Sequence, residues 1–293
     1  MSIESFPLPE QSSAEIKLIE DPEVTAADIF GDLPEVGGSK IILQRHERST
    51  RKLSGKEGER LGSLTPESSE SVYIHARRIL REMFASVKEE ERRGVYFLVV
   101  GSDTKFRGQG MRSLETANQV LRALKDELDE ERMDQDRVLN NFSKTKHASP
   151  ISRAREPQFL DDSPTFVAFL KQKYGEMTPE FWQAFEEDTH KGERQKFKAE
   201  GPDEMDKRFV GYVRALSKYA VYFHKNHPGA RLVIWCVSHY DTVSPFLKRH
   251  ITKTDPLQPV PIDYGAGISI EIDPQGAVSS RFRGKEYCVD FKN

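Results

Sequence analysis

The sequence predicts an α/β protein, a three-layer α/β/α sandwich whose central sheet is mainly parallel. Three short apolar runs, each of strand length, are separated by stretches with the three- and four-residue spacing of amphipathic helices. Strands that alternate with helices in this way are typical of parallel sheets covered by helices. The second run is apolar throughout, as expected of a strand that is covered on both faces.

The chain is expected to form one domain, residues 39–293, behind a loosely ordered N-terminal arm, residues 1–38, which has no sustained hydrophobic period. The first predicted strand covers residues 40–44. The pair Thr65-Pro66 then marks a helix start, because a hydroxyl residue can cap a helix and proline fits its first turn.

The middle of the chain continues this alternation and then departs from it. Residues 95–100 form the second predicted strand, and a helix is expected from about Arg112. Residues 132–226 are interpreted as a helical insertion over the functional site, because a polar, irregular stretch is followed there by three helical patterns. These patterns cover residues 164–174, 179–189 and 203–226.

The last part of the chain completes the predicted sheet. A third strand at residues 232–237 is followed by a helix at residues 242–251. Two closing strands, residues 267–272 and 277–289, are joined by an Asp-Pro-Gln-Gly turn. In open α/β sheets, ligands bind outside the carboxyl ends of the strands, so the functional residues are expected there.

The composition excludes several classes of protein. The chain has 44 basic and 47 acidic residues, a formal net charge of −3, so no global basic field attracts nucleic acid or an anionic membrane. The two cysteines exclude a disulfide framework. No apolar stretch approaches the ~20 residues of a membrane helix, and the N-terminus lacks the features of a secretion signal. We expect a cytoplasmic protein, with its oligomeric state open.

Two of the apolar strands end in a histidine. Arg45-His46 follows the first strand, Ser238-His239 follows the third, and Arg112 opens a helix after the second. The carboxyl ends of parallel strands share one edge of a sheet, so these residues would form a local cationic pocket. Arginine binds phosphate oxygens bidentately, and a neutral imidazole can attack phosphorus. The pattern therefore predicts a site for a phosphoryl group.

The order of these motifs resembles the histidine phosphatase (phosphoglycerate mutase-like) superfamily. Its hallmark is Arg-His-Gly after the first strand, where this chain has Arg-His-Glu beginning at Arg45. The run Arg-Ser-Leu-Glu-Thr-Ala that begins at Arg112 is similar to the family's Arg-Ala-x-Glu-Thr-Ala. Val-Ser-His-Tyr-Asp around His239 is similar to its Val-Ser-His-Gly-Asp. The resemblance covers the motifs between residues 40 and 272, and it implies a phosphoglycerate mutase-like fold.

The resemblance implies a metal-independent phosphatase that hydrolyses a phosphomonoester through a phosphohistidine on His46 and needs no cofactor. Its partner would be a phosphorylated small molecule or a phosphopeptide. Arg45, Arg112 and His239 would bind the phosphoryl group, and His239 would also assist catalysis. The family's general acid lies between the second arginine and the last histidine, where Glu156 is our choice. The competing acids are Asp161, Asp162 and Glu176.

Three alternatives stay open. A mutase-like phosphoryl transferase would use extra cations such as Arg48 and Arg51, which are also possible substrate contacts of a phosphatase. A catalytically weak phosphate-binding regulatory protein is favoured by Glu47, which stands where the family has glycine, as does Tyr240. A metal hydrolase ranks last, because adjacent residues rarely share one ion. Its ligands would be His46, Glu47, His239 and Asp241.

Overall fold

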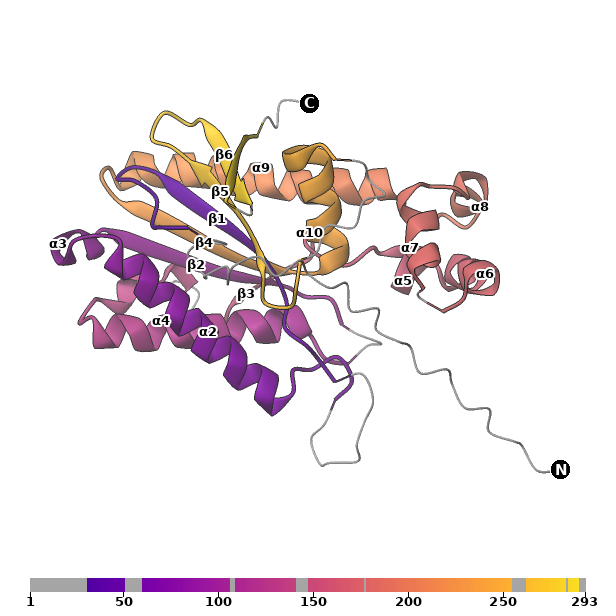
Figure 1. Cartoon of the computed structure of the whole chain (residues 1–293), viewed down its shortest axis with the longest axis horizontal. Helices are drawn as coiled ribbons and strands as arrows, with labels where there is room; N and C mark the ends of the chain where they lie inside the picture. The colour runs from indigo at the N-terminus through magenta and orange to yellow at the C-terminus, as the bar shows by residue number, and fades with distance from the viewer. Residues whose placement is uncertain are drawn as a thin grey trace.

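The computed structural model shows an α/β protein (Figure 1). It describes residues 31–50, 60–105, 109–140, 147–176, 178–254, 262–282 and 284–289. Most of the predicted N-terminal arm and the proposed substrate contact Arg51 therefore lie outside the described residues.

A mixed sheet of seven strands, in the order β3-β2-β4-β1-β5-β6-β7, forms the centre of the molecule. The strands are β1 (Ser39–Arg45), β2 (Val95–Ser102), β3 (Ser149–Ile151), β4 (Arg231–Ser238), β5 (Gly267–Ile272), β6 (Val278–Phe282) and β7 (Lys285–Cys288). The first four strands in this order are parallel, and β5, β6 and β7 are antiparallel. The predicted fold class, with a mainly parallel sheet in the core, is confirmed.

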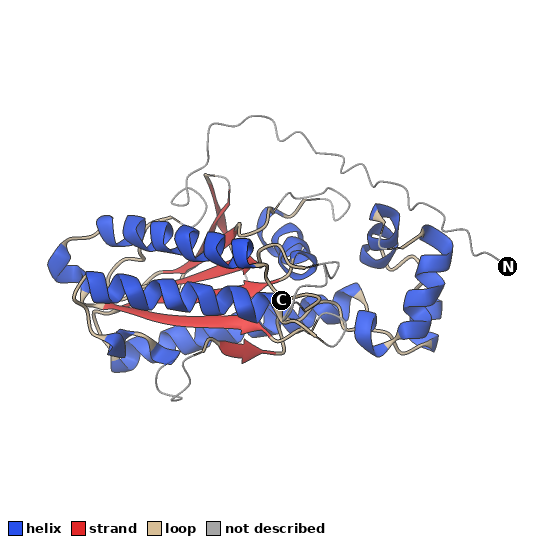
Figure 2. Cartoon of the chain, turned by 90° about the horizontal axis from the view of Figure 1, so that it is seen from below, coloured by secondary structure: helices blue, strands red, loops and turns tan. Residues whose placement is uncertain are grey.

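Helices cover both faces of this sheet (Figure 2). The long helices α2 (Pro66–Ala85) and α4 (Arg112–Glu130) pack on one face, and α9 (Pro202–Asn226) and α10 (Tyr240–Phe246) pack on the other. Successive side chains of a strand point to opposite faces. Ile42 of β1 therefore joins the α2–α4 core, while its neighbours Ile41 and Leu43 join the α9–α10 core.

The first residue of α2 and the position of α4 against the sheet follow from the local sequence. Thr65 caps α2 by accepting a hydrogen bond from the backbone N–H of Ser68 at 3.1 Å, as predicted. Gly101 of β2 lies against the first turns of α4. A Cβ there would come within 2.9 Å of the Leu114 backbone and of the Ala117 side chain. Glycine thus lets α4 begin close to the end of β2, beside the predicted site.

The predicted helical insertion, residues 132–226, consists of three parts. It begins with η2 (Gln135–Arg137) and β3, continues with four short helices, and ends with α9, which packs on the sheet. The short helices, here called the helical insert, are α5 (Phe159–Asp162), α6 (Pro164–Tyr174), α7 (Pro179–Glu186) and α8 (Lys191–Lys196). They enclose an aromatic core of their own around Phe159 and lie at one end of the molecule (Figure 1).

Several element bounds differ from the prediction. The helix that starts at Thr65-Pro66 was expected to run to about Glu91, whereas α2 ends at Ala85 and a separate short helix α3 (Glu89–Arg92) follows it. The last predicted strand is interrupted at Gly284, whose positive φ of 70° suits a turn, and forms β6 and β7. The helix after β4 continues as a π-helix, η4 (Leu247–Thr252). The strand β3 was missed, because its three residues are too few to show a period.

Residues 31–38, which the sequence placed in the arm, contact the sheet in the structure. Leu33 is buried in the α2–α4 core. The carbonyl of Pro34 accepts a hydrogen bond from Arg231 Nε at 2.8 Å, and Gly37 N–H donates to the carbonyl of Ala230 at 2.8 Å. These contacts extend the packed part of the described chain to residues before β1.

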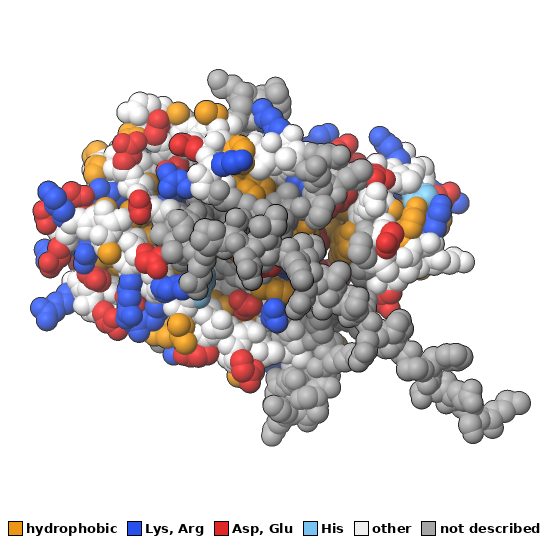
Figure 3. Space-filling view, in the orientation of Figure 1, with side chains coloured by type: hydrophobic (Ala, Val, Ile, Leu, Met, Phe, Trp, Pro, Cys, Tyr) orange, Lys and Arg blue, Asp and Glu red, His pale blue; other side chains and the backbone are white. Residues whose placement is uncertain are grey.

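The described surface carries charges of both signs. Acidic and basic side chains are interspersed on the face that Figure 3 shows. Of the helices in the described residues, none combines the length and the apolar character that crossing a membrane requires.

Candidate active site

The ends of β1 and β4 bring two histidines together. The strands are parallel and pair Arg45 with Ser238. The backbone N–H of His46 donates to the carbonyl of Ser238 at 2.9 Å, which continues this pairing by one residue. The ring centroids of His46 and His239 lie 5.1 Å apart. Their exposed fractions are 4% and 1%, so both imidazoles are almost completely buried at the predicted edge of the sheet.

The orientation of the His46 ring is fixed by a backbone carbonyl. Nδ1 of His46 lies 2.6 Å from the carbonyl oxygen of Glu47. A carbonyl only accepts, so Nδ1 carries the proton in a neutral ring and Nε2 keeps its lone pair. The structure thus sets the tautomer that nucleophilic attack by Nε2 requires.

Glu47 adopts this position without backbone strain. The described non-glycine residues with positive φ are four others, so Glu47 does not occupy the left-handed region. Its backbone N–H donates to Oγ1 of Thr116 at 3.3 Å, and its carboxylate accepts from the backbone N–H of Arg48 at 2.9 Å. Glu47 therefore binds the His46 ring through its backbone carbonyl without strain in its own backbone.

Burial and nearby cations keep both histidines neutral. Burial is the largest cause that holds the pKa of His46 well below its usual value, followed by the charge of Arg112. Burial also lowers the pKa of His239 well below the usual value, followed by the charges of Arg112 and Arg45. At neutral pH, His46 is thus the free base that a nucleophile must be.

Arg112 and Glu156 meet beside these histidines. Arg112 is the first residue of α4, and its Nη2 forms an ion pair with Oε1 of Glu156. The same oxygen lies 2.9 Å from Nδ1 of His239, although the two atoms are not aligned as a hydrogen bond. The structure therefore brings together Arg112, His239 and the acid chosen from the sequence.

The competing acids lie elsewhere. Asp161 and Asp162 are exposed on α5, and Asp161 has a raised pKa because of partial burial and the neighbouring charge of Asp162. Glu176 is exposed and pairs with Lys171 at 2.7 Å. None of the three has a described contact with the two histidines.

Arg45 lies between two tyrosine rings. Its guanidinium carbon is 3.8 Å from the ring centroid of Tyr264 and 5.1 Å from that of Tyr240, within the range of cation–π attraction. Its Nη1 donates to the carbonyl of Ile262 at 2.7 Å. Its Nε is buried and has no hydrogen-bond partner among the described residues. An anion would satisfy such an N–H, whose burial without a partner costs about 1–3 kcal/mol.

The sequence missed several residues that support the site. The ring of Tyr264 packs against the guanidinium of Arg45. The guanidinium carbon of the exposed Arg48 lies 5.5 Å from the same ring centroid, so the prediction of Arg48 as a substrate contact stays open. The hydroxyls of Ser102 and Ser113 each lie 3.1 Å from Nε2 of His239. Ser113 was visible as the one departure within the second arginine motif, whereas no pattern in the sequence singles out Tyr264.

The arrangement favours an anion over a metal ion. One ring nitrogen each of His46 and His239 and an oxygen of Glu156 lie within 4.8 Å of one another, a spacing that could hold a cation. However, Arg112 pairs with that glutamate, and the charge of Arg45 lowers the pKa of both histidines. A divalent cation would meet two guanidinium groups there. This set also differs from the predicted metal set, which contained Glu47 and Asp241 instead of Glu156.

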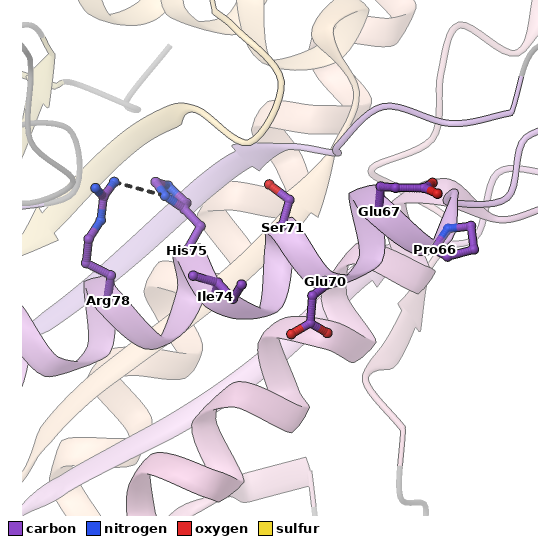
Figure 4. A pocket seen from close by; sticks show the side chains of 7 residues that line it. All are labelled: Pro66, Glu67, Glu70, Ser71, Ile74, His75 and Arg78. Atoms are coloured by element: carbon purple, nitrogen blue, oxygen red, sulfur yellow. Dashed lines mark hydrogen bonds between the residues drawn. The ribbon is translucent and has the colours of Figure 1, made fainter.

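Two surface hollows lie apart from these residues. An open groove of about 760 Å³ runs along α2, where Arg78 donates to His75 at 3.1 Å (Figure 4). Its described lining is Pro66, Glu67, Glu70, Ser71, Ile74, His75 and Arg78. A second hollow of about 470 Å³ lies beside α8. Neither lining includes His46, Arg112 or His239.

Comparison with known proteins gives similarity of fold. No family model matches the sequence, and no curated protein matches it. Among solved structures, the chain is similar to phosphoglycerate mutase from Bacillus anthracis, with 13% identity over 83% of this chain and 92% of that chain and a TM-score of 0.47. It is also similar to Hafnia alvei phytase in complex with tartrate, with 12% identity over 85% and 84% and a TM-score of 0.42. With both TM-scores below 0.5, the assignment of function rests on the residues of the site.

Proposed function

We propose that this protein is a metal-independent phosphatase that hydrolyses a phosphomonoester through a phosphohistidine on His46. The observation that carries the proposal is the state of this side chain. His46 is buried and has a lowered pKa, and its Nδ1 is bound to a carbonyl. A neutral imidazole with one nitrogen fixed is suited to attack with the other.

The surrounding cations would bind the phosphoryl group. Arg45 offers a buried N–H that has no partner in the described part of the chain, and Arg112 offers the guanidinium that now pairs with Glu156. A phosphate dianion would replace the carboxylate at Arg112, because guanidinium forks bind phosphate oxygens strongly. His239 would donate a hydrogen bond to the same group. Charge on the phosphoryl oxygens would thus be stabilised in the transition state.

The reaction would proceed in two steps. The lone pair on Nε2 of His46 forms a bond to phosphorus while the bond from phosphorus to the ester oxygen breaks. Glu156, protonated from solvent after phosphate displaces it from Arg112, donates that proton to the leaving oxygen. The Glu156 carboxylate then takes a proton from water, whose oxygen attacks phosphorus, and the phosphorus–nitrogen bond breaks. Inorganic phosphate and free His46 are the products.

The test is rapid quenching with a phosphomonoester labelled in its phosphate, at alkaline pH, where phosphohistidine survives better than in acid. We expect label on the wild type, none on His46→Ala, slower labelling of His239→Ala, and unchanged turnover with a chelator. Label on His46→Ala, or full turnover by this variant, would refute the mechanism. Binding of phosphate without label or turnover would indicate a phosphate-binding regulatory protein, and transfer of the label to a second substrate a mutase.

A further inference from the structure

The loop that carries Glu156, residues 153–158, is held from the sheet side by the residues after β2. Below it is called the acid loop. The N–H of Glu156 donates to Oγ1 of Thr104 at 3.2 Å. Arg155 forms a bidentate pair with Asp103, with Nε–Oδ1 and Nη2–Oδ2 distances of 2.7 and 2.9 Å. One side of the loop is thus joined to the sheet.

Oγ of Ser238 also donates to the carbonyl of Ala154 at 2.8 Å and Oγ1 of Thr242 to that of Arg155 at 3.1 Å, and an arginine of α9 makes further contacts with the acid loop. Nη1 of Arg208 donates to the carbonyl of Arg153 at 2.8 Å and to that of Arg155 at 3.2 Å. Nη2 donates to the carbonyl of Glu156 at 3.2 Å. Three backbone carbonyls within four residues are therefore bound to one guanidinium, whose planar fork fixes their spacing.

Glu200 holds that guanidinium in turn. Its two carboxylate oxygens accept from Nε and Nη2 of Arg208 at 2.9 and 3.1 Å. One of them also accepts from the backbone N–H of Gln158 at 2.6 Å. The side chains of Arg208 and Glu200 are only 15% and 10% exposed, so water competes weakly for these charge-assisted bonds. The pair therefore fixes both ends of the acid loop.

We propose that Arg208, oriented by Glu200, is a positioning residue that places the Glu156 carboxyl for proton transfer to the leaving oxygen. This inference rests on the proposed function. Proton transfer needs an acid within hydrogen-bond reach of the leaving oxygen, and a misplacement of about 1 Å can cost roughly 10²-fold in rate. Arg208 forms hydrogen bonds to the backbone of the acid loop and to Glu200, and none to a described side chain of the phosphoryl pocket, where its charge is a minor cause of the lowered pKa of His239. Its positioning role acts through Glu156.

The test compares kcat/KM for two phosphomonoesters that differ in leaving group. An alkyl phosphate needs its leaving oxygen protonated, whereas 2,4-dinitrophenyl phosphate releases 2,4-dinitrophenolate, a stable anion that needs no proton. Arg208→Gln is expected to lose about 10- to 100-fold on the alkyl phosphate, and far less on the dinitrophenyl ester. Glu156→Gln should show the same selectivity. Glu200→Gln keeps Arg208 but weakens its ion pair, so it should show the same selectivity between the two substrates to a smaller degree.

The control is Arg249→Gln. Arg249 lies in η4 and pairs at 3.1 Å with Asp203 of α9, the helix that carries Arg208. It makes no described contact with the acid loop. Its removal should leave both substrates unaffected. A double variant supplies a second readout: Arg208→Gln should add little to the loss that Glu156→Gln causes, because both act on one proton transfer. Equal losses on both substrates, or fully additive losses, would overturn the proposal.

Hydrogen exchange separates this proposal from the proposed function. The amides of residues 153–156 and of Gln158 should exchange faster in Arg208→Gln than in the wild type or in Arg249→Gln. Unchanged exchange would overturn the proposal, whatever the activity. If the wild type turned over neither substrate, or if Glu156→Gln lost equally on both, Glu156 as general acid would be rejected, and the positioning role with it.

Discussion

At the ends of β1 and β4, each histidine of the site follows directly from a buried strand, whereas Glu156 lies on a loop before the helical insert. The main chain fixes His46, through the pairing of β1 with β4 and the bond to the Ser238 carbonyl. Side chains fix the acid loop, chiefly Arg208 and the residues after β2.

This difference determines how each part of the site can fail. A strand ladder shares its strength over many hydrogen bonds and is lost only when the sheet opens. The acid loop is held by separate side-chain contacts, and a single substitution at Arg208 removes three of them at once. Changes near the sheet should therefore reduce the reaction of every phosphomonoester. Changes near the insert should reduce only reactions that need a proton for the leaving group.

The largest effect is expected from Phe159→Ala. Phe159 is fully buried in the insert core, and its ring lies 4.4 Å from that of Phe185 and 5.7 Å from that of Phe166. We expect the free energy of unfolding to fall by about 3–5 kcal/mol, as measured with denaturant. Because Phe159 directly follows the acid loop, kcat/KM should fall for alkyl phosphates and much less for dinitrophenyl phosphate.

The matched control is Phe97→Ala, which removes a ring from the α2–α4 core. It should destabilise the protein by a similar amount. Under conditions in which the variant is folded, kcat/KM should change equally for both esters. Selective kinetics in Phe97→Ala, or unselective kinetics in Phe159→Ala, would remove the distinction between the two regions.

Arg112→Ala tests the sheet side of the comparison. Removal of one preorganised charge-stabilising donor costs about 10²–10³ in turnover. The loss should appear for both esters, because Arg112 would bind the phosphoryl group that they share. Arg122, further along α4 and over the ring of Tyr73 at 4.3 Å, supplies the control Arg122→Ala. Near-normal kinetics of Arg112→Ala would place the phosphoryl group elsewhere.

A smaller effect is expected on stability at acid pH. Both His46 and His239 have a lowered pKa in the folded protein, chiefly through burial, and would return to about 6.5 on unfolding. Below pH 6.5 the unfolded chain binds protons that the folded chain does not. The free energy of unfolding should then fall, by up to about 1.4 kcal/mol per pH unit for each group.

Denaturant titrations between pH 7.5 and 5 would measure this dependence. His46→Gln should reduce the slope of the free energy of unfolding against pH by the equivalent of up to one proton. Subtracting the variant's curve from that of the wild type cancels the contributions of other groups. Parallel curves for the wild type and the variant would mean that His46 titrates alike in the folded and unfolded chain, so that burial does not hold it neutral below pH 6.5.

The sequence predicted the sheet side of the site better than the insert side. The runs before His46 and His239 are apolar and of strand length, so the ends of β1 and β4 were placed within one residue. The start of α4 at Arg112 was also predicted correctly. These features depend on local periodicity, which a single sequence displays.

The contacts that hold the acid could not be predicted in the same way. Glu156 was chosen through the resemblance, and no local pattern supported it. Arg208 lies 52 residues further along the chain from Glu156. The packing of Tyr264 on Arg45 joins residues separated by more than two hundred positions. Such contacts arise from the tertiary arrangement, and their members have no shared spacing in the sequence.

The smallest effect is expected from Glu47→Gly, which places at the end of β1 the glycine of the motif that the sequence resembles. The bond to His46 uses the backbone carbonyl of Glu47, which glycine also has, and Glu47 has no positive φ to relieve. Turnover should therefore stay nearly constant. The carboxylate, however, places a negative charge beside a site for anions.

Removing that charge should lower KM by about fivefold at most, since one half-buried surface charge contributes on the order of 1 kcal/mol. Glu47→Gln is the matched variant, because it removes the charge and keeps the backbone preferences of a side chain. Both substitutions should shift KM alike and leave kcat unchanged. If Glu47→Gly alone raised kcat tenfold or more, the glutamate would be misaiming His46. The strand ladder would then be insufficient to place the nucleophile, and the natural chain would be better described as a weak catalyst that binds phosphate.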